Sequence, residues 1–122
     1  MMKDVIHFYR VKSLSLVKAF YQDILELTLY KDQTQCLIYD THGFGKLGFC
    51  LHHPEKDINQ SCITFVYDTK DDVDQQHRKL KEHGIFAESP TVNQTFHIYH
   101  FFAKDFNGLT VEFQVFLDEA SL

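Results

Sequence analysis

The sequence predicts an α+β protein made of two modules, each with the order strand, helix and three strands. A chain of 122 residues is one domain's worth of sequence. One strand-like run, one helix-like stretch and three more strand-like runs follow one another, and the same order then repeats. A shift of 55 positions lays His7 on Cys62 and Leu25 on Leu80, so the two halves keep step through their first strand and helix. We therefore expect a single domain over 1–122, with module one at about 1–53 and module two at about 61–117.

Module one opens with a run rich in β-branched and aromatic residues at 5–11, which is typical of a strand. Ser13 or Ser15 can cap the helix that follows, because a serine hydroxyl accepts the free amide protons of a first turn. Turn-forming aspartates and glycines then separate three short strand-like runs at about 28–31, 35–39 and 47–52. The apolar positions of the helix recur at i, i+3 and i+4: Leu16, Val17, Phe20, Tyr21, Ile24 and Leu25.

Module two follows a polar loop at 54–60 and begins with a strand at about 62–67. Asp68 or Thr69 can cap its helix, and Gly84 is a suitable left-handed residue for the helix end. The remaining strands are expected at about 85–88, 96–103 and 109–116. The first turn of this helix holds Asp71 and Asp72, where the helix dipole favours them, and its inward positions are Val73, Gln76, His77 and Leu80.

The final hairpin allows its register to be predicted. A three-residue loop over 106–108, with Gly108 in a left-handed bulge position, is a common hairpin geometry. It sets Phe102 opposite Glu112 and His100 opposite Gln114, which gathers these four side chains on one face. The other face is then wholly apolar and should pack on the helices, with Phe101 opposite Phe113 and Tyr99 opposite Val115. A slip by one residue would exchange the faces, so this register is favoured.

Composition excludes several partners. Lysine plus arginine number 12 against 17 acidic residues, and the net charge of −5 offers no counter-charge to nucleic acid or an anionic membrane. No apolar run approaches a membrane span, and the N-terminus shows no secretory signal. The three cysteines, Cys36, Cys50 and Cys62, are odd in number and lack CxxC spacing. We therefore expect reduced cysteines and a cytoplasmic protein.

The order of motifs resembles the vicinal oxygen chelate superfamily, which includes glyoxalases, bleomycin-resistance proteins and extradiol dioxygenases. His7-Phe8-Tyr9-Arg10-Val11 and Ala19-Phe20-Tyr21-Gln22-Asp23-Ile24-Leu25 look like the first strand and its "FYxxxLG" helix end. Leu80 to Ile85 looks like "LxxxGV", and Asp105-Phe106-Asn107-Gly108-Leu109-Thr110-Val111-Glu112-Phe113 looks like the "DPDGNxIEF" hairpin. Two positions depart from the pattern: Glu26 stands where glycine is frequent, and Phe106 replaces the hairpin proline. The resemblance covers nearly the whole chain.

The resemblance implies a curled mixed sheet that encloses a cavity, with the helices on its outer face and one residue from each of four strands at a shared metal. The positions carried over are His7, Cys50, Cys62 and Glu112. Imidazole, thiolate and carboxylate are all zinc ligands, and four of them would close a structural site, whereas a set without Cys50 would leave an open position. The implied cofactor is a divalent ion (Zn, Ni, Mn or Fe) or none, since free cysteines also serve as buried small hydrophobes. Small members usually form homodimers, and we expect one here.

Two function classes follow. The first is a metal-dependent lyase, transferase or isomerase on a small oxygen-rich substrate, with Glu112 as ligand or base and His100 as auxiliary acid–base. The second is a metal-free protein that sequesters a flat or cationic compound in an aromatic cup, as bleomycin-resistance members do. An idle domain serving assembly or regulation is a third reading. The expected ligand-contacting residues are Tyr9, Phe44, Thr64, Phe102 and Gln114.

Overall fold

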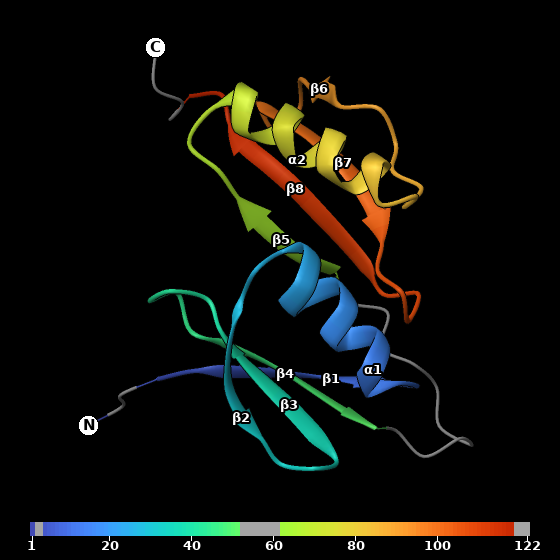
Figure 1. The fold of residues 1–122 in the computed structure, drawn as a ribbon. Helices are drawn as coiled ribbons and strands as arrows, with labels where there is room; N and C mark the ends of the chain where they lie inside the picture. The colour runs from blue at the N-terminus through green and yellow to red at the C-terminus, as the bar shows by residue number, and fades with distance from the viewer. Residues whose placement is uncertain (2–3, 52–61, 119–122) are drawn as a thin grey trace. The chain divides into compact units, whose positions relative to one another are not determined.

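A computed structural model of the protein describes residues 1, 4–51 and 62–118. The chain divides into two compact units, Met1–Asn59 and Gln60–Leu122, and Figure 1 shows a four-stranded sheet with helical structure in each of them. The polar loop expected at 54–60, together with His52 and His53, lies outside the described residues. The predicted α+β class, with two modules of strand, helix and three strands, is confirmed.

The first unit has the strand order β1-β4-β3-β2, in which β1 pairs parallel with β4 and the other pairs are antiparallel. The last strand to be made, β4, therefore lies inside the sheet between β1 and β3. The helical segment is a short α-helix that continues as a π-helix. The elements are β1 (Ile6–Val11), α1 (Leu14–Val17), the π-helix η1 (Lys18–Ile24), β2 (Thr28–Asp32), β3 (Cys36–Asp40) and β4 (Lys46–Leu51).

The helical segment of the first unit begins and ends as local chemistry requires. Ser13 is its cap, and its hydroxyl accepts from the Leu16 amide. The amide of Leu25 donates to the carbonyl of Phe20, five residues back, as in a π-helix. Glu26 then takes a left-handed φ of 62° where a glycine would be unstrained. Of the expected apolar positions, Val17, Phe20, Tyr21 and Ile24 are buried, whereas Leu16 is exposed.

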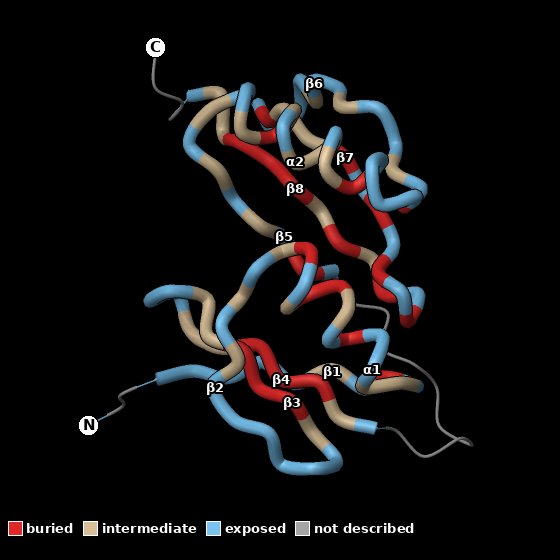
Figure 2. The backbone as a smooth tube through the Cα atoms, in the orientation of Figure 1, coloured by how far each residue is buried: buried red, intermediate tan, exposed pale blue. Residues whose placement is uncertain are grey.

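The second unit repeats this topology with the order β5-β8-β7-β6, in which β5 pairs parallel with β8. Thr69 caps its helix by accepting from the Asp72 amide, and Gly84 follows the helix with φ of 73°. Figure 2 shows buried residues along the central strands, β3 and β4 in the first unit and β8 in the second. The elements are β5 (Cys62–Val66), α2 (Lys70–Glu82), β6 (Thr91–Asn93), β7 (Ile98–Lys104) and β8 (Thr110–Phe116).

The predicted register of the last hairpin is confirmed in every pair. His100 lies opposite Gln114 and Phe102 opposite Glu112. The three-residue loop ends at Gly108, which has φ of 86°. Buried Asp105 holds this loop, because its Oδ1 accepts from the amides of Asn107 and Leu109 at 2.8 Å each.

The prediction of a strand at 85–88 is wrong. Only an isolated bridge joins Ala87 to Ala103, and the edge strand of the sheet is Thr91–Asn93 instead. The amide of Ile85 is occupied by the helix end, where it donates to the carbonyl of Leu80. Pro90 has no amide proton to give to a ladder. Regular pairing therefore starts only after the proline.

The expectation of three reduced cysteines is also wrong, because Cys36 and Cys50 form a disulfide. They are direct partners across β3 and β4, with Cα atoms 4.1 Å apart. The Leu51 amide donates to the Gln35 carbonyl, so the neighbouring pair is the hydrogen-bonded one and the cysteine pair is the closer, non-bonded kind. The inference of a cytoplasmic location rested on reduced cysteines, and this disulfide removes that support.

Candidate functional site

The chemistry-bearing side chains gather on one face of the second sheet. The opposite face packs on α2: the Tyr99 hydroxyl donates to Asp74 at 2.6 Å, and the His77 ring meets Phe101 edge-on. Because side chains alternate along a strand, His100 and Phe102 point away from the helix. We call this side the helix-free face of the second unit. From β7 it carries Ile98, His100, Phe102 and Lys104, from β8 Thr110, Glu112, Gln114 and Phe116, and from β5 Cys62 and Thr64.

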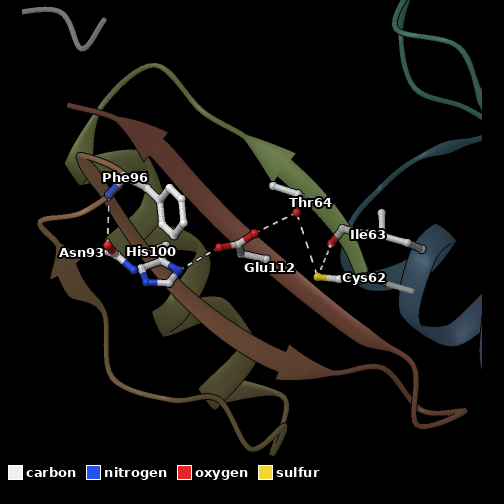
Figure 3. Close-up of polar contacts among 7 residues, drawn as sticks. All are labelled: Cys62, Ile63, Thr64, Asn93, Phe96, His100 and Glu112. Atoms are coloured by element: carbon white, nitrogen blue, oxygen red, sulfur yellow. Dashed lines mark hydrogen bonds and ion pairs between the residues drawn. The ribbon is translucent and has the colours of Figure 1, made fainter. Parts of the chain in front are cut away.

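A carboxylate lies at the centre of this face. Glu112 Oε1 accepts from the Thr64 hydroxyl at 2.8 Å, and Oε2 lies 2.7 Å from His100 Nδ1 (Figure 3). The His100 and Glu112 side chains are each only 12% exposed, so water screens their interaction weakly. A carboxylate accepts and does not donate, so Nδ1 of the imidazole carries the proton. Thr64, Glu112 and His100 therefore form a connected polar chain across three strands.

A cavity of about 380 Å³ lies over this hydrogen-bonded group, with His100 and Glu112 on its wall. Its lining combines four polar side chains with three phenylalanine rings, and a mostly apolar wall with a few polar groups is the usual composition of a small-molecule site. The ring of His100 also meets that of Phe102 edge-on, with centroids 5.2 Å apart. The lining residues are Asn93, Phe96, Ile98, His100, Phe102, Glu112, Gln114 and Phe116.

Four of the expected site residues thus line one cavity, and Thr64 supports them from the next strand. Sequence reasoning missed Ile98 and Phe116, although both continue the alternation that placed His100 and Gln114. It also missed Asn93 and Phe96, which come from β6 and the turn after it. Phe96 continues the same alternation, but the strand expected at 96–103 begins only at Ile98, and Phe96 lies in the turn before it. Asn93 lies in a three-residue strand, which is too short to show a pattern.

Cys62 lies on the same helix-free face and keeps a free thiol. Its sulfur is 3.9 Å from the Thr64 hydroxyl, which in turn donates to Glu112. Burial raises the pKa of the Cys62 thiol, and the nearby Glu112 charge raises it further. A raised pKa favours the protonated form of the free thiol.

The first strand does not bring His7 and Tyr9 to a helix-free face. Tyr9 stacks on Phe49 with ring centroids 5.9 Å apart, and Phe49 contacts Tyr21 of the helical segment at 4.3 Å. Residues two apart share a face, so exposed His7 is on the helix-packed side of its sheet together with buried Val11. In the first strand, Ile6 and Phe8 occupy the face that corresponds to Cys62 and Thr64, so the expected alternation was shifted by one residue.

Cys50 and Phe44 also lie elsewhere. The sulfur of Cys50 is bonded to Cys36 and has no thiolate to offer an ion. Phe44 lies in the β3–β4 turn of the first unit and is 90% exposed.

The resemblance implies a divalent ion held by His7, Cys50, Cys62 and Glu112. Within 4–51 and 62–118, no three histidine, cysteine or acidic side chains are close enough together to hold a metal. As these residues lie, they do not fit a metal centre.

The family model for the glyoxalase/bleomycin resistance protein/dioxygenase superfamily matches residues 5–113. The chain belongs to this superfamily. That match covers both sheets and the hairpin that carries Glu112, in agreement with the resemblance seen in the motifs. No curated protein sequence matches the chain.

Several solved structures share the fold at low sequence identity. A lactoylglutathione lyase from Agrobacterium tumefaciens has a TM-score of 0.77 and 19% identity, covering 94% of each chain. TnmS3, an antibiotic binding protein from Streptomyces sp. CB03234, has a TM-score of 0.77 and 17% identity, covering 94% of this chain and 96% of its own. The fosfomycin resistance protein FosX from Listeria monocytogenes has a TM-score of 0.71 and 14% identity, covering 94% and 92%. In the described part of this superfamily member, no helix is long and apolar enough to cross a bilayer.

Proposed function

We propose that the helix-free face of the second unit binds a small oxygen-rich molecule and that the His100–Glu112 pair exchanges a proton with it. The reaction class would be that of a lyase, transferase or isomerase. The observation that carries the proposal is the Glu112 carboxylate, held at 2.7 Å from His100 on the wall of a cavity of about 380 Å³. A paired, shielded imidazole and carboxylate facing a cavity is the arrangement that general acid–base catalysis needs.

The hydrogen bonds favour His100 as the group that takes the proton. Its Nδ1 donates to Glu112, which leaves the lone pair of Nε2 to accept a proton from a bound molecule. Within the described residues, no hydrogen bond to Nε2 competes for that lone pair. Glu112 would then hold the ring in the required tautomer and stabilise the imidazolium that forms. This exchanges the roles expected from the sequence, in which Glu112 was ligand or base and His100 the auxiliary.

The aromatic wall suits binding. Phe96 is 68% exposed and Phe102 is 37% exposed, and both line the cavity. Exposed rings of this size lose contact with water when a flat molecule covers them, which favours binding. The Gln114 amide lines the same cavity and can orient a polar substituent.

A second function remains a candidate, namely sequestration of a flat compound without chemistry. The three phenylalanines of the cavity, Phe96, Phe102 and Phe116, favour it, as does the net charge of −5, which would attract a cation. The structural neighbour TnmS3 is described as an antibiotic binding protein.

Screening and turnover together test the proposal. A library of small carbonyl, epoxide and hydroxy-acid compounds is screened by thermal shift, and each binder is incubated with the protein and followed by NMR. We expect at least one binder to be converted, with a rate that falls about 10²-fold or more in both His100→Gln and Glu112→Gln. His83→Gln, at an exposed histidine after α2, is the matched control and should keep the full rate.

The two functions predict different outcomes. Conversion that depends on His100 and Glu112 and persists after treatment with EDTA supports the proposed acid–base role. Binders that are all recovered unchanged overturn it in favour of sequestration. Conversion at an undiminished rate in both variants also overturns it, since the proton would then be transferred elsewhere.

A further inference from the structure

A second cavity of about 370 Å³ adjoins the first on the same helix-free face. Phe102 lines both cavities, so the two meet at one aromatic ring. The second cavity contains polar groups of a different kind, including a lysine, and none of them belongs to the His100–Glu112 pair. Its lining residues are Phe86, Glu88, Phe102, Ala103, Lys104 and Thr110.

We propose that Lys104 and Thr110 bind an oxyanion of the same small molecule, so that its substrates carry a carboxylate or a chemically similar group. This inference rests on the proposed function, because it places the anion next to the His100–Glu112 pair. It identifies the class of ligand, which the acid–base pair alone does not.

The two residues are held as a pair by the sheet. Lys104 and Thr110 are direct partners across β7 and β8, and Lys104 Nζ donates to Thr110 Oγ1 at 2.7 Å. The ammonium keeps two further N–H groups, and the threonine hydroxyl keeps its own proton to donate. Three donors therefore remain for an acceptor in the cavity.

The charge of Lys104 is not neutralised by a neighbour. Within the described residues no carboxylate forms an ion pair with it, and it is the only lysine or arginine that lines either cavity. Glu88, an exposed residue, also lines this cavity and opposes anion binding by repulsion. We therefore expect a preference for a single negative charge, and we expect removal of the Glu88 charge to strengthen binding.

The spacing on β8 limits the size of the ligand. Thr110 and Glu112 are two residues apart on one strand, a separation of roughly 7 Å along the sheet. A molecule whose anionic group and reacting atom are separated by one ring or a short chain could reach both places. Its middle would lie on Phe102, which lines both cavities.

Benzoate is a suitable probe, with benzyl alcohol as the neutral match and benzylamine as the cation. Each is titrated into the full chain in low-salt, phosphate-free buffer and followed through the backbone amides by NMR. We expect benzoate to shift the amides of Phe102, Lys104, Thr110 and Glu112, and to bind about tenfold more tightly than benzyl alcohol. Lys104→Met should remove that preference, Lys104→Arg should keep it, and Glu88→Gln should increase it.

The anion site and the proton-transfer site can fail separately. Glu112→Gln should abolish conversion but still bind benzoate more tightly than benzyl alcohol, because the anion lies at Lys104 and not at the carboxylate. Equal affinity for benzoate and benzyl alcohol, or an unchanged preference in Lys104→Met, would overturn the anion site alone. Selective benzoate binding without conversion of any compound would leave the anion site standing and overturn the acid–base role.

Discussion

The two units share one topology, but the sheet face that does not pack on a helix is used in opposite ways in the two units. In each unit the first strand pairs parallel with the last, which lies inside the sheet and carries a buried phenylalanine on the helix side, Phe49 or Phe113. The residue just before that phenylalanine is Gly48 in the first unit and Glu112 in the second. The cross-strand neighbours of Gly48 are Phe8 and Ile38. Those of Glu112 are Thr64 and Phe102.

This difference teaches that the fold does not determine the chemistry. In the first unit, the Phe8 ring occupies the space above Gly48, and a disulfide joins the next rung of β3 and β4. In the second unit, the corresponding space is a cavity with a carboxylate on its wall. One face carries a disulfide and a packed ring, and the other carries the cavity that we propose binds a ligand. Of the three predictions that follow, ordered from the largest expected effect to the smallest, the first two test that division and the third compares the helix-packed faces.

Loss of the Cys36–Cys50 disulfide should cost the most stability. The bond closes a loop with a sequence separation of 14, and loss of such a constraint on the unfolded chain costs about 3 kcal/mol. Urea unfolding of the wild type with and without dithiothreitol measures this difference. The double variant Cys36→Ser with Cys50→Ser should no longer respond to the reductant, and Cys62→Ser should respond like the wild type. A wild type with unchanged stability under reductant would contradict the assigned role of this face.

A side chain at Gly48 should be the next most costly change. A Cβ built there would overlap the Phe8 ring, so Gly48→Ala must displace that ring and should cost about 2 kcal/mol. Because Phe8 is 53% exposed, Phe8→Ala alone should cost less. The double variant has no clash, so its loss of stability should be well below the sum of the losses in the two single variants. Additive losses in the denaturation measurements would show that the ring does not close this face.

The smallest effect concerns the helix-packed faces. The Tyr99 hydroxyl donates to the Asp74 carboxylate, and this bond is the main reason why the pKa of Tyr99 is raised to about 12. Tyr99→Phe removes the bond and should lower the free energy of unfolding by about 1 kcal/mol at pH 8. A phenol whose folded pKa is raised contributes its full stability below pH 10 and loses it as the pH rises toward 12. The difference between wild type and variant should therefore shrink over that range. The counterpart Tyr39→Phe removes a bond to the uncharged Gln22 amide and should cost less at pH 8.

The second unit could be predicted from sequence in more detail than the first. The hairpin loop at Gly108 fixes the register of β7 and β8, and alternation then places His100, Phe102, Glu112 and Gln114 on one face. In the first strand, Phe8 and Tyr9 are both aromatic, so alternation does not indicate which one faces the helix. His7 was carried over from the family motif, and in the structure it shares a face with Tyr9 and Val11.

The disulfide escaped prediction for a related reason. Cys36 and Cys50 become neighbours only if the turn between β3 and β4 has one particular length, and this turn includes His42 at a left-handed φ of 61°. A histidine there gives no sequence signal for that conformation, unlike Gly43 and Gly45 beside it. The edge strand Thr91–Asn93 is likewise too short to produce a pattern.

The placement of the last strand inside each sheet also affects synthesis on the ribosome. Ile6 finds its partner Lys46 only after about forty further residues have been made, and Cys62 waits still longer for Thr110. Until then, the partners of β1 and β5 do not exist, and their amides and apolar side chains have no sheet to join. Each half of the nascent protein therefore acquires its tertiary structure late, when its closing strand leaves the exit tunnel.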